Sequence, residues 1–163
     1  MTFKGYSLKI TMKRGDELRC CTFIGHRDCS QEVEKLLCVV IENLITKEDV
    51  NEFYVGTNGN FDYYVYRVLL QLKKQYDIKI NVVISYLNNK KNSCYDYNET
   101  IYPVGLERIP KRFAIKKSNE FMIKNSEYLV CYVNNTYSNA YKFLIYAKNK
   151  KLNIINLCDQ ELF

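Results

Sequence analysis

The stretch CTFIGHR, residues 21–27, begins as a run typical of a buried strand and ends abruptly in Gly25, His26 and Arg27. His26 is the only histidine of the chain, and no conventional turn sequence separates the strand from it. Either these three residues only end the strand and have no functional role, or the strand places them where they bind an anionic partner. The rest of the chain decides how this stretch is interpreted.

A helix pattern follows this strand directly. Apolar residues at positions 33, 36, 37, 40, 41 and 44 form one stripe with helical spacing. Further patterns predict strands at 52–56, 78–86, 128–133 and 152–157, and helices at 65–76, 113–125 and 140–147. Alternation at 6–12 predicts an extra N-terminal strand. Strands that alternate with helices predict an α/β fold, with a Rossmann-like, mostly parallel open sheet and helices on both faces.

Length and composition predict one globular domain over residues 1–163, with residues 1–18 as an N-terminal strand extension. The 163 residues are 47% hydrophobic and 26% charged, which is typical of a chain that buries a core. No apolar run reaches the length of a membrane span, and the N-terminus lacks a signal-peptide block, so a cytoplasmic location is expected. Seven cysteines without a Cys-x-x-Cys pair, with one histidine, predict neither a metal site nor a cofactor.

The net charge of +6 permits an anionic partner. The lysines are scattered rather than gathered in one run, which favours a solvated surface and makes nucleic acid the less favoured partner. A homodimer is expected, because symmetric dimers are the commonest assembly and the tyrosine-rich residues 63–66 could contribute to an interface.

Polar and glycine-rich segments follow the predicted strands. Ligands of open parallel sheets bind beyond the carboxyl ends of the strands, so these segments form the candidate site. Gly56 and Gly59 precede a predicted helix start and allow an anion to approach the backbone closely. Arg27 can bind a phosphate or carboxylate with two hydrogen bonds. The residues expected to bind the ligand are Gly25, His26, Arg27, Gly56, Thr57, Asn58, Gly59, Phe61, Asp62, Tyr86, Arg112, Asn119, Tyr137, Ser138 and Asn139.

Individual residues of this set have alternative interpretations. Asp62 either caps its helix or accepts hydrogen bonds from ribose hydroxyls. Phe61, Tyr86 or Tyr137 could stack on a base, since an aromatic face suits any nucleobase. Arg112 and Asn119 are expected to line the opposite wall. No catalytic residue is predicted.

Four segments resemble the YspA-like branch of the SLOG superfamily, which includes the LOG enzymes and the DprA proteins. They are CCTFIGHRD at 20–28, FYVGTNGNFDYYV at 53–65, YPVGLERIPKRFAI at 102–115 and the stretch from 119 to 157. The resemblance implies a modified Rossmann fold with a nucleotide-like ligand at the strand ends. It also implies a link to signalling or antiviral defence, because some superfamily members sense NAD-derived signals.

The chain departs from that superfamily in two places. Ser118-Asn119 stands where relatives tend to carry Arg-Asn, and Ser138-Asn139 stands where they tend to carry Gly-Gly. The Pro-Gly-Gly-x-Gly-Thr-x-x-Glu signature of the LOG enzymes does not occur in the sequence. Loss of the signature favours a non-catalytic binder of an NAD-, ADP-ribose- or AMP-like ligand, acting as a sensor or sequestering protein.

Two alternatives remain open. The first is a hydrolase of nucleotide N-glycosidic bonds, for which Asp62 and Glu120 are the available acids and His26 a possible proton donor. The second is single-stranded nucleic-acid binding of the DprA type, which the net charge and the fifteen tyrosines permit.

Overall fold

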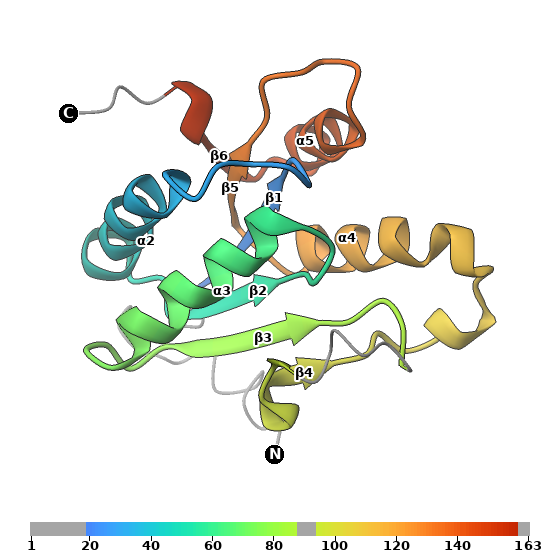
Figure 1. The fold of residues 1–163 in the computed structure, drawn as a ribbon, viewed down its shortest axis with the longest axis horizontal. Helices are drawn as coiled ribbons and strands as arrows, with labels where there is room; N and C mark the ends of the chain where they lie inside the picture. The colour runs from blue at the N-terminus through green and yellow to red at the C-terminus, as the bar shows by residue number, and fades with distance from the viewer. Residues whose placement is uncertain (1–18, 88–93, 160–163) are drawn as a thin grey trace.

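A six-stranded open sheet organises the chain in the computed structural model, which describes residues 19–87 and 94–159 (Figure 1). The strand order is β4-β3-β2-β1-β5-β6, and every described pair of strands is parallel. The strands are β1 Cys20–Gly25, β2 Glu52–Val55, β3 Lys79–Val83, β4 Thr100–Ile101, β5 Tyr128–Tyr132 and β6 Asn153–Asn156. The predicted α/β fold with a Rossmann-like parallel sheet is confirmed, while the predicted strand at 6–12 lies outside the described residues.

Helices cover both faces of this sheet. The helices are α2 Val33–Glu48, α3 Asn60–Lys73, α4 Ala114–Lys124 and α5 Asn139–Asn149, joined by the short 3-10 segments η3 Tyr97–Glu99, η4 Leu106–Arg108, η5 Lys111–Phe113 and η6 Leu157–Asp159. α2 and α3 pack together on one face, and α4 and α5 pack together on the other (Figure 1). None of the helices in the described ranges is long and apolar enough to cross a bilayer.

The alternation of side chains along β1 explains why both faces are covered. Cys21 and Phe23 are fully buried beneath α2 and α3, and the Phe23 ring stacks at 6.1 Å on that of Phe53. Ile24, one position on, belongs to the second core, beneath α4 and α5. A fully buried side chain of this size contributes about 1.5–3 kcal/mol, so a strand apolar on both sides is stable only between two helical layers.

The sixth strand, β4, lies in a region where the sequence patterns predict no strand. β4 has two residues, Thr100 and Ile101, which pair with the end of β3. Two residues are too few to show a period in sequence, and the pairing depends on tertiary contacts. Tyr66 of α3 donates to the carboxylate of Glu99, and Lys73 forms an ion pair with it, which anchors the chain just before β4.

The strand order has one point at which it reverses. From β1 the chain builds β2, β3 and β4 outward on one side, then returns to place β5 and β6 on the other. The reversal lies between β1 and β5, whose register pairs Gly25 with Tyr132 at the carboxyl edge. Connections that diverge at such a point leave room for a ligand beyond the strand ends.

Candidate functional site

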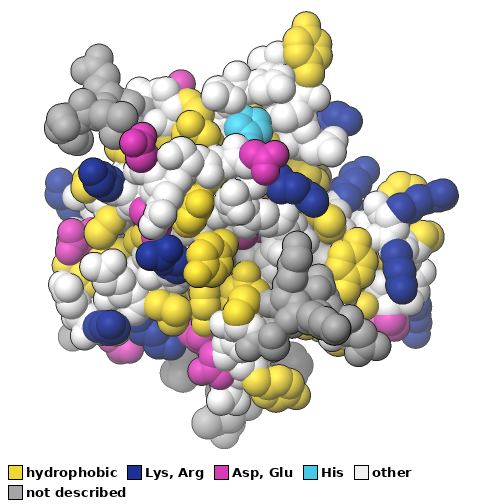
Figure 2. All heavy atoms as spheres, in the orientation of Figure 1, with side chains coloured by type: hydrophobic (Ala, Val, Ile, Leu, Met, Phe, Trp, Pro, Cys, Tyr) yellow, Lys and Arg dark blue, Asp and Glu magenta, His cyan; other side chains and the backbone are white. Residues whose placement is uncertain are grey.

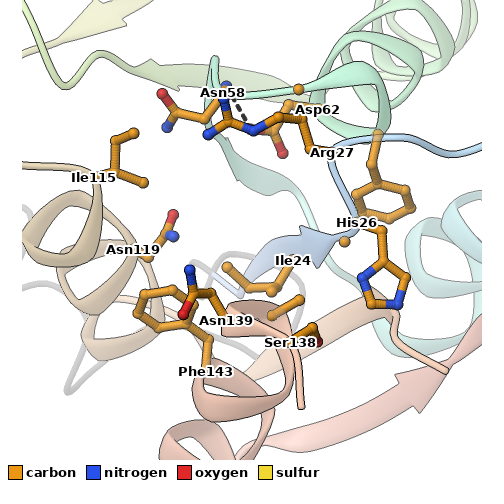
Figure 3. A pocket seen from close by; sticks show the side chains of 14 residues that line it. Ile24, His26, Arg27, Asn58, Asp62, Ile115, Asn119, Ser138, Asn139 and Phe143 are labelled. Atoms are coloured by element: carbon orange, nitrogen blue, oxygen red, sulfur yellow. Dashed lines mark hydrogen bonds between the residues drawn. The ribbon is translucent and has the colours of Figure 1, made fainter. Parts of the chain in front are cut away.

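A hollow of about 280 Å³ lies at this reversal point, beyond the carboxyl ends of β1, β2 and β5 (Figure 3). Its volume is at the low end of the range of small-molecule pockets, close to the size of a mononucleotide. The lining residues are Ile24, Gly25, His26, Arg27, Asn58, Gly59, Phe61, Asp62, Ile115, Asn119, Ser138, Asn139, Ala140 and Phe143. Segments that are far apart in sequence therefore meet at one edge of the sheet.

Gly25 is required by close packing with Phe61. A Cβ atom built on Gly25 would lie 2.3 Å from the Phe61 ring, closer than any real contact. The ring is 1% exposed and stacks on Tyr132 with a centroid distance of 6.4 Å. Phe61 is therefore a buried support beneath the hollow, and its ring does not offer a face on which a base could stack.

Gly59 is required by a second close approach, between the loop before α3 and the segment after β1. A Cβ on Gly59 would lie 2.8 Å from the Cα of Arg27. The backbone N–H of Asn60 donates to the carbonyl of Arg27 at 2.9 Å, so the start of α3 is joined to this segment. The two glycines thus bring the start of α3 against the end of β1.

His26 connects the ends of β1 and β5. Its backbone N–H donates to the carbonyl of Tyr132 at 3.3 Å, and the backbone N–H of Asn134 donates to its ring atom Nε2 at 3.1 Å. An accepting Nε2 places the ring proton of neutral imidazole on Nδ1. The predicted role of His26 as a donor to phosphate is therefore restricted to Nδ1, because Nε2 is already used.

Arg27 is the cationic group of the hollow. In the described part of the chain, its side chain has no hydrogen bond or ion pair, and its interaction with Asp62 is electrostatic attraction. The residue is exposed, and Figure 3 shows its side chain beside Asn58 and Asp62 at the edge of the hollow. An unpaired guanidinium at a strand end can accept a planar anion with two hydrogen bonds.

Asp62 is the one carboxyl group among the described residues that line the hollow. Its Oδ2 accepts the backbone N–H of Asn58 at 2.9 Å and would lie 2.8 Å from a Cβ on Gly56. Burial raises the pKa of Asp62 to about 6, against the lowering effects of this hydrogen bond and of Arg27. Asp62 is the third residue of α3, and its carboxylate accepts a hydrogen bond from the loop before the helix, as the side chain at that position does in a capping box. This geometry supports the interpretation of Asp62 as a capping residue of its helix.

Asn58 begins a chain of polar side chains that leads away from the hollow. Its Nδ2 donates to Ser85 Oγ at 3.4 Å, and Ser85 Oγ donates to Ser118 Oγ at 3.0 Å. Both serines are almost fully buried. This chain connects the segment after β2, the end of β3 and the helix α4.

The opposite wall of the hollow comes from α4 and α5. Figure 3 shows Asn119, Asn139 and Phe143 across the hollow from Arg27 and Asn58, with Ile115 beside them. The side-chain amides of Asn119 and Asn139 have no hydrogen-bond partner among the described residues. This wall therefore offers apolar surface together with unused donors and acceptors.

Ser138 has a structural role at the start of α5. Its hydroxyl accepts the backbone N–H of Tyr141 at 3.1 Å and donates to the carbonyl of Asn135 at 2.7 Å. This is the N-cap arrangement that serine favours. The hydroxyl proton is therefore already used, and the expected hydrogen bond from Ser138 to a ligand can come only through its remaining acceptor capacity.

Five of the fifteen predicted residues do not line the hollow, namely Gly56, Thr57, Tyr86, Arg112 and Tyr137. Gly56 lies behind Asp62. Tyr86 donates to the carbonyl of Lys111, and the Arg112 guanidinium lies 4.8 Å from the ring centre of Phe113. Tyr137 is 95% exposed. Glu120, considered as an acid, forms ion pairs with Lys116 and Lys117 and also lies outside this lining.

Four lining residues were not predicted, namely Ile24, Ile115, Ala140 and Phe143. They are apolar residues at strand or helix positions, where sequence patterns indicate core rather than site. Only the arrangement of α4 and α5 around the reversal point exposes part of these side chains to the hollow. The signal in the sequence was the set of polar and glycine-rich segments that follow the strands. Such a signal does not identify the apolar residues of the walls.

The fold and the hollow together define a class, the α/β proteins with a Rossmann-like parallel sheet and a pocket at its carboxyl edge. A comparison with models of protein families and a comparison with curated proteins each find no match to this sequence. Among solved structures, the X-ray structure of DNA processing protein A (DprA) from Streptococcus pneumoniae is similar, with a TM-score of 0.63 and 16% sequence identity.

The similarity to DprA covers 87% of this chain and 52% of the DprA chain, so the present chain spans about half the length of that protein. At this level of identity the similarity is one of fold. The expected Rossmann-like fold is supported by it, while the assignment to the SLOG superfamily and its YspA-like branch remains a prediction.

Proposed function

We propose that the protein binds a nucleotide-derived ligand at the hollow and does not alter it, as a sensor or a sequestering protein. The observation that carries this proposal is Arg27, whose guanidinium lies at the reversal point of a parallel sheet and has no hydrogen bond or ion pair within residues 19–87 and 94–159. Across the hollow lie the side-chain amides of Asn119 and Asn139, which have no hydrogen-bond partner in the part of the chain that the structure describes. A cationic end and a neutral hydrogen-bonding end match a molecule with phosphate at one side and a base at the other.

The phosphate is expected beside Arg27 and the start of α3. No side chain caps the first turn of α3, and the backbone N–H groups of a helix start attract anions. Because Gly59 has no side chain, the backbone of Arg27 approaches the start of α3 closely. The two features act together, because Arg27 lies against Gly59.

The base is expected between α4 and α5. Ile115 and Phe143 supply apolar surface, and the two asparagine amides can each donate to and accept from a base edge. Asp62 is suited to accept hydrogen bonds from ribose hydroxyls between the two ends. These hydrogen bonds would also lower the free-energy cost of ionising the buried Asp62 carboxyl group.

Hydrolysis of an N-glycosidic bond is the second candidate, favoured by the pKa of Asp62, which burial raises to about 6. A carboxyl group with such a pKa can exchange a proton near neutral pH. Against this candidate, Asp62 has no second carboxyl group beside it in the described lining, and its Oδ2 is used by the backbone of Asn58. Binding without chemistry is therefore the primary proposal.

Calorimetry of the purified protein with AMP, ADP-ribose and NAD+ tests binding, and chromatography of each ligand after overnight incubation tests chemistry. We expect heat of binding for at least one ligand and recovery of all of them unchanged. Arg27→Ala should weaken binding roughly 10- to 100-fold, with Lys148→Ala, at the far end of α5, as a matched loss of one surface charge. Absence of binding to all three ligands at millimolar concentration would contradict the proposal.

Single-stranded nucleic acid is a less favoured partner. Figure 2 shows Lys and Arg side chains spread over both sides of the face rather than gathered in one patch. A titration with an oligonucleotide at increasing salt measures this alternative, because purely electrostatic association weakens steeply with salt.

A further inference from the structure

A second hollow, of about 510 Å³, lies beyond the ends of β3 and β4. It is larger than the first hollow, and the proposed mononucleotide site makes no use of it. Its lining includes Ser85, Tyr86, Tyr102, Leu106, Glu107 and Lys111. Both hollows belong to the same carboxyl edge of the sheet.

The two hollows share a wall. Asn58 lines the first hollow and Ser85 lines the second, and their side chains are hydrogen-bonded at 3.4 Å. The first turn of α4 lies between them as well, since Ala114 lines the second hollow and Ile115 lines the first. A ligand that extends past Asn58 would therefore leave the first hollow and reach the second.

The second hollow suits an aromatic ring attached to a sugar. Tyr86 and Tyr102 supply aromatic surface, and Leu106 adds aliphatic surface. Glu107 can accept hydrogen bonds from hydroxyl groups. The hydroxyl of Tyr86 donates to the carbonyl of Lys111 at 3.0 Å, which holds the ring in place.

Resting on the function proposed above, we infer that the ligand is a dinucleotide-type molecule, with two nucleoside halves joined by a pyrophosphate. One nucleotide half occupies the first hollow, and the second half occupies the hollow at β3 and β4. The pyrophosphate lies beside Arg27 and Asn58, between the two. Dinucleotides in open sheets usually lie across the reversal point, whereas here both halves lie on one path from β5 toward β4.

The first experiment uses the unaltered protein and ligands of increasing length, namely AMP, ADP, ADP-ribose and NAD+, each measured by calorimetry. We expect NAD+ to bind at least about 10-fold more tightly than AMP, because its second nucleoside half adds aromatic and hydroxyl contacts, whereas ADP-ribose, whose second half is a ribose without a base, should lie between the two. Equal affinity for AMP and NAD+ would overturn this inference and leave the proposed function intact. Binding of none of the four would overturn both.

The second experiment measures the ratio of NAD+ affinity to AMP affinity in two variants. Tyr86→Ala removes the ring, and we expect the ratio to fall about 10-fold, toward one. Tyr86→Phe keeps the ring and removes the hydroxyl that donates to Lys111, so the ratio should stay within about 3-fold of its original value. The ratio is insensitive to a uniform loss of folded protein. An unchanged ratio in Tyr86→Ala would overturn the inference.

Discussion

The two walls of the first hollow are built in different ways. On the α3 side, Gly25 and Gly59 allow backbone and rings to approach closely, and the polar groups of His26 and Asp62 are already hydrogen-bonded within the protein. On the α4 and α5 side, the amides of Asn119 and Asn139 have no partner among the described residues.

This difference separates support from recognition. Residues of the α3 wall should affect folding more than binding, whereas residues of the opposite wall should affect binding more than folding. Arg27 is the main exception on the α3 side, because its guanidinium has no hydrogen bond or ion pair among the described residues. Substitutions in each wall therefore test whether the two walls differ in this way.

The largest expected effect is that of Gly25→Ala. The added Cβ would collide with the buried Phe61 ring, and we expect a loss of about 3 kcal/mol in the free energy of unfolding, measured by urea denaturation. Gly105→Ala is the matched control. It has a positive φ of 86° with open space around its Cβ position, so backbone strain alone should cost about 1 kcal/mol. A smaller loss for Gly25→Ala than for the control would contradict the packing argument.

Substitution of Arg27 should affect affinity without affecting stability. A hydrogen bond to a charged group contributes about 1.5–3 kcal/mol, so Arg27→Ala should weaken AMP or ADP-ribose binding roughly 10- to 100-fold in calorimetry. Arg27→Lys keeps the charge but loses the planar fork, and an intermediate affinity is expected. If the variant unfolds at the same urea concentration yet binds as tightly as the unaltered protein, Arg27 does not contact the ligand.

Asp62→Asn should make stability less dependent on pH. The pKa of Asp62 is about 6 in the folded protein against an ordinary value of 3.8, so the folded state holds a proton that the unfolded state has already lost between these values. Stability therefore falls as pH rises through this window, and the cost of the buried charge is fully present above about pH 6.

Replacing the carboxylate with an amide removes that cost and keeps an oxygen for the N–H of Asn58. We expect the Asn variant to gain roughly 1–2 kcal/mol relative to the unaltered protein at pH 7.5, and to lose this advantage at pH 4. Urea denaturation at the two pH values measures the difference. A constant offset at both values would show that Asp62 does not titrate in this range.

The smallest expected effect is that of Asn139→Ala on the α5 wall. The change should weaken nucleotide binding by about 5-fold, through loss of one neutral hydrogen bond, and change stability by less than about 0.5 kcal/mol. Ser138→Ala, one residue earlier, is the matched comparison. It removes the N-cap of α5 and should cost about 1 kcal/mol of stability with little effect on affinity. If Ser138→Ala weakens binding and Asn139→Ala lowers stability, then Ser138 contacts the ligand and Asn139 supports the helix.

Much of the fold was predictable because its signals are local. The run of buried residues that ends at Gly25, and the apolar stripe that begins at Val33, identify β1 and α2 without tertiary information. β4 was not predictable, since its two residues acquire their structure from the end of β3. The same distinction holds at the hollow, where polar strand ends were predicted and the apolar residues Ile115 and Phe143 were not.

By itself, the sequence determined the order of strands and helices and the polar character of the strand ends, because hydrophobic period and glycine placement are properties of neighbouring residues. Which of those polar groups the protein itself hydrogen-bonds, and which have no partner among the described residues, depends on the tertiary structure. His26 accepts a hydrogen bond from Asn134, 108 residues away, whereas the nearby Arg27 has no such partner among the described residues. Hydrogen-bond partners separated this far along the chain are brought together by packing, and no local pattern records them.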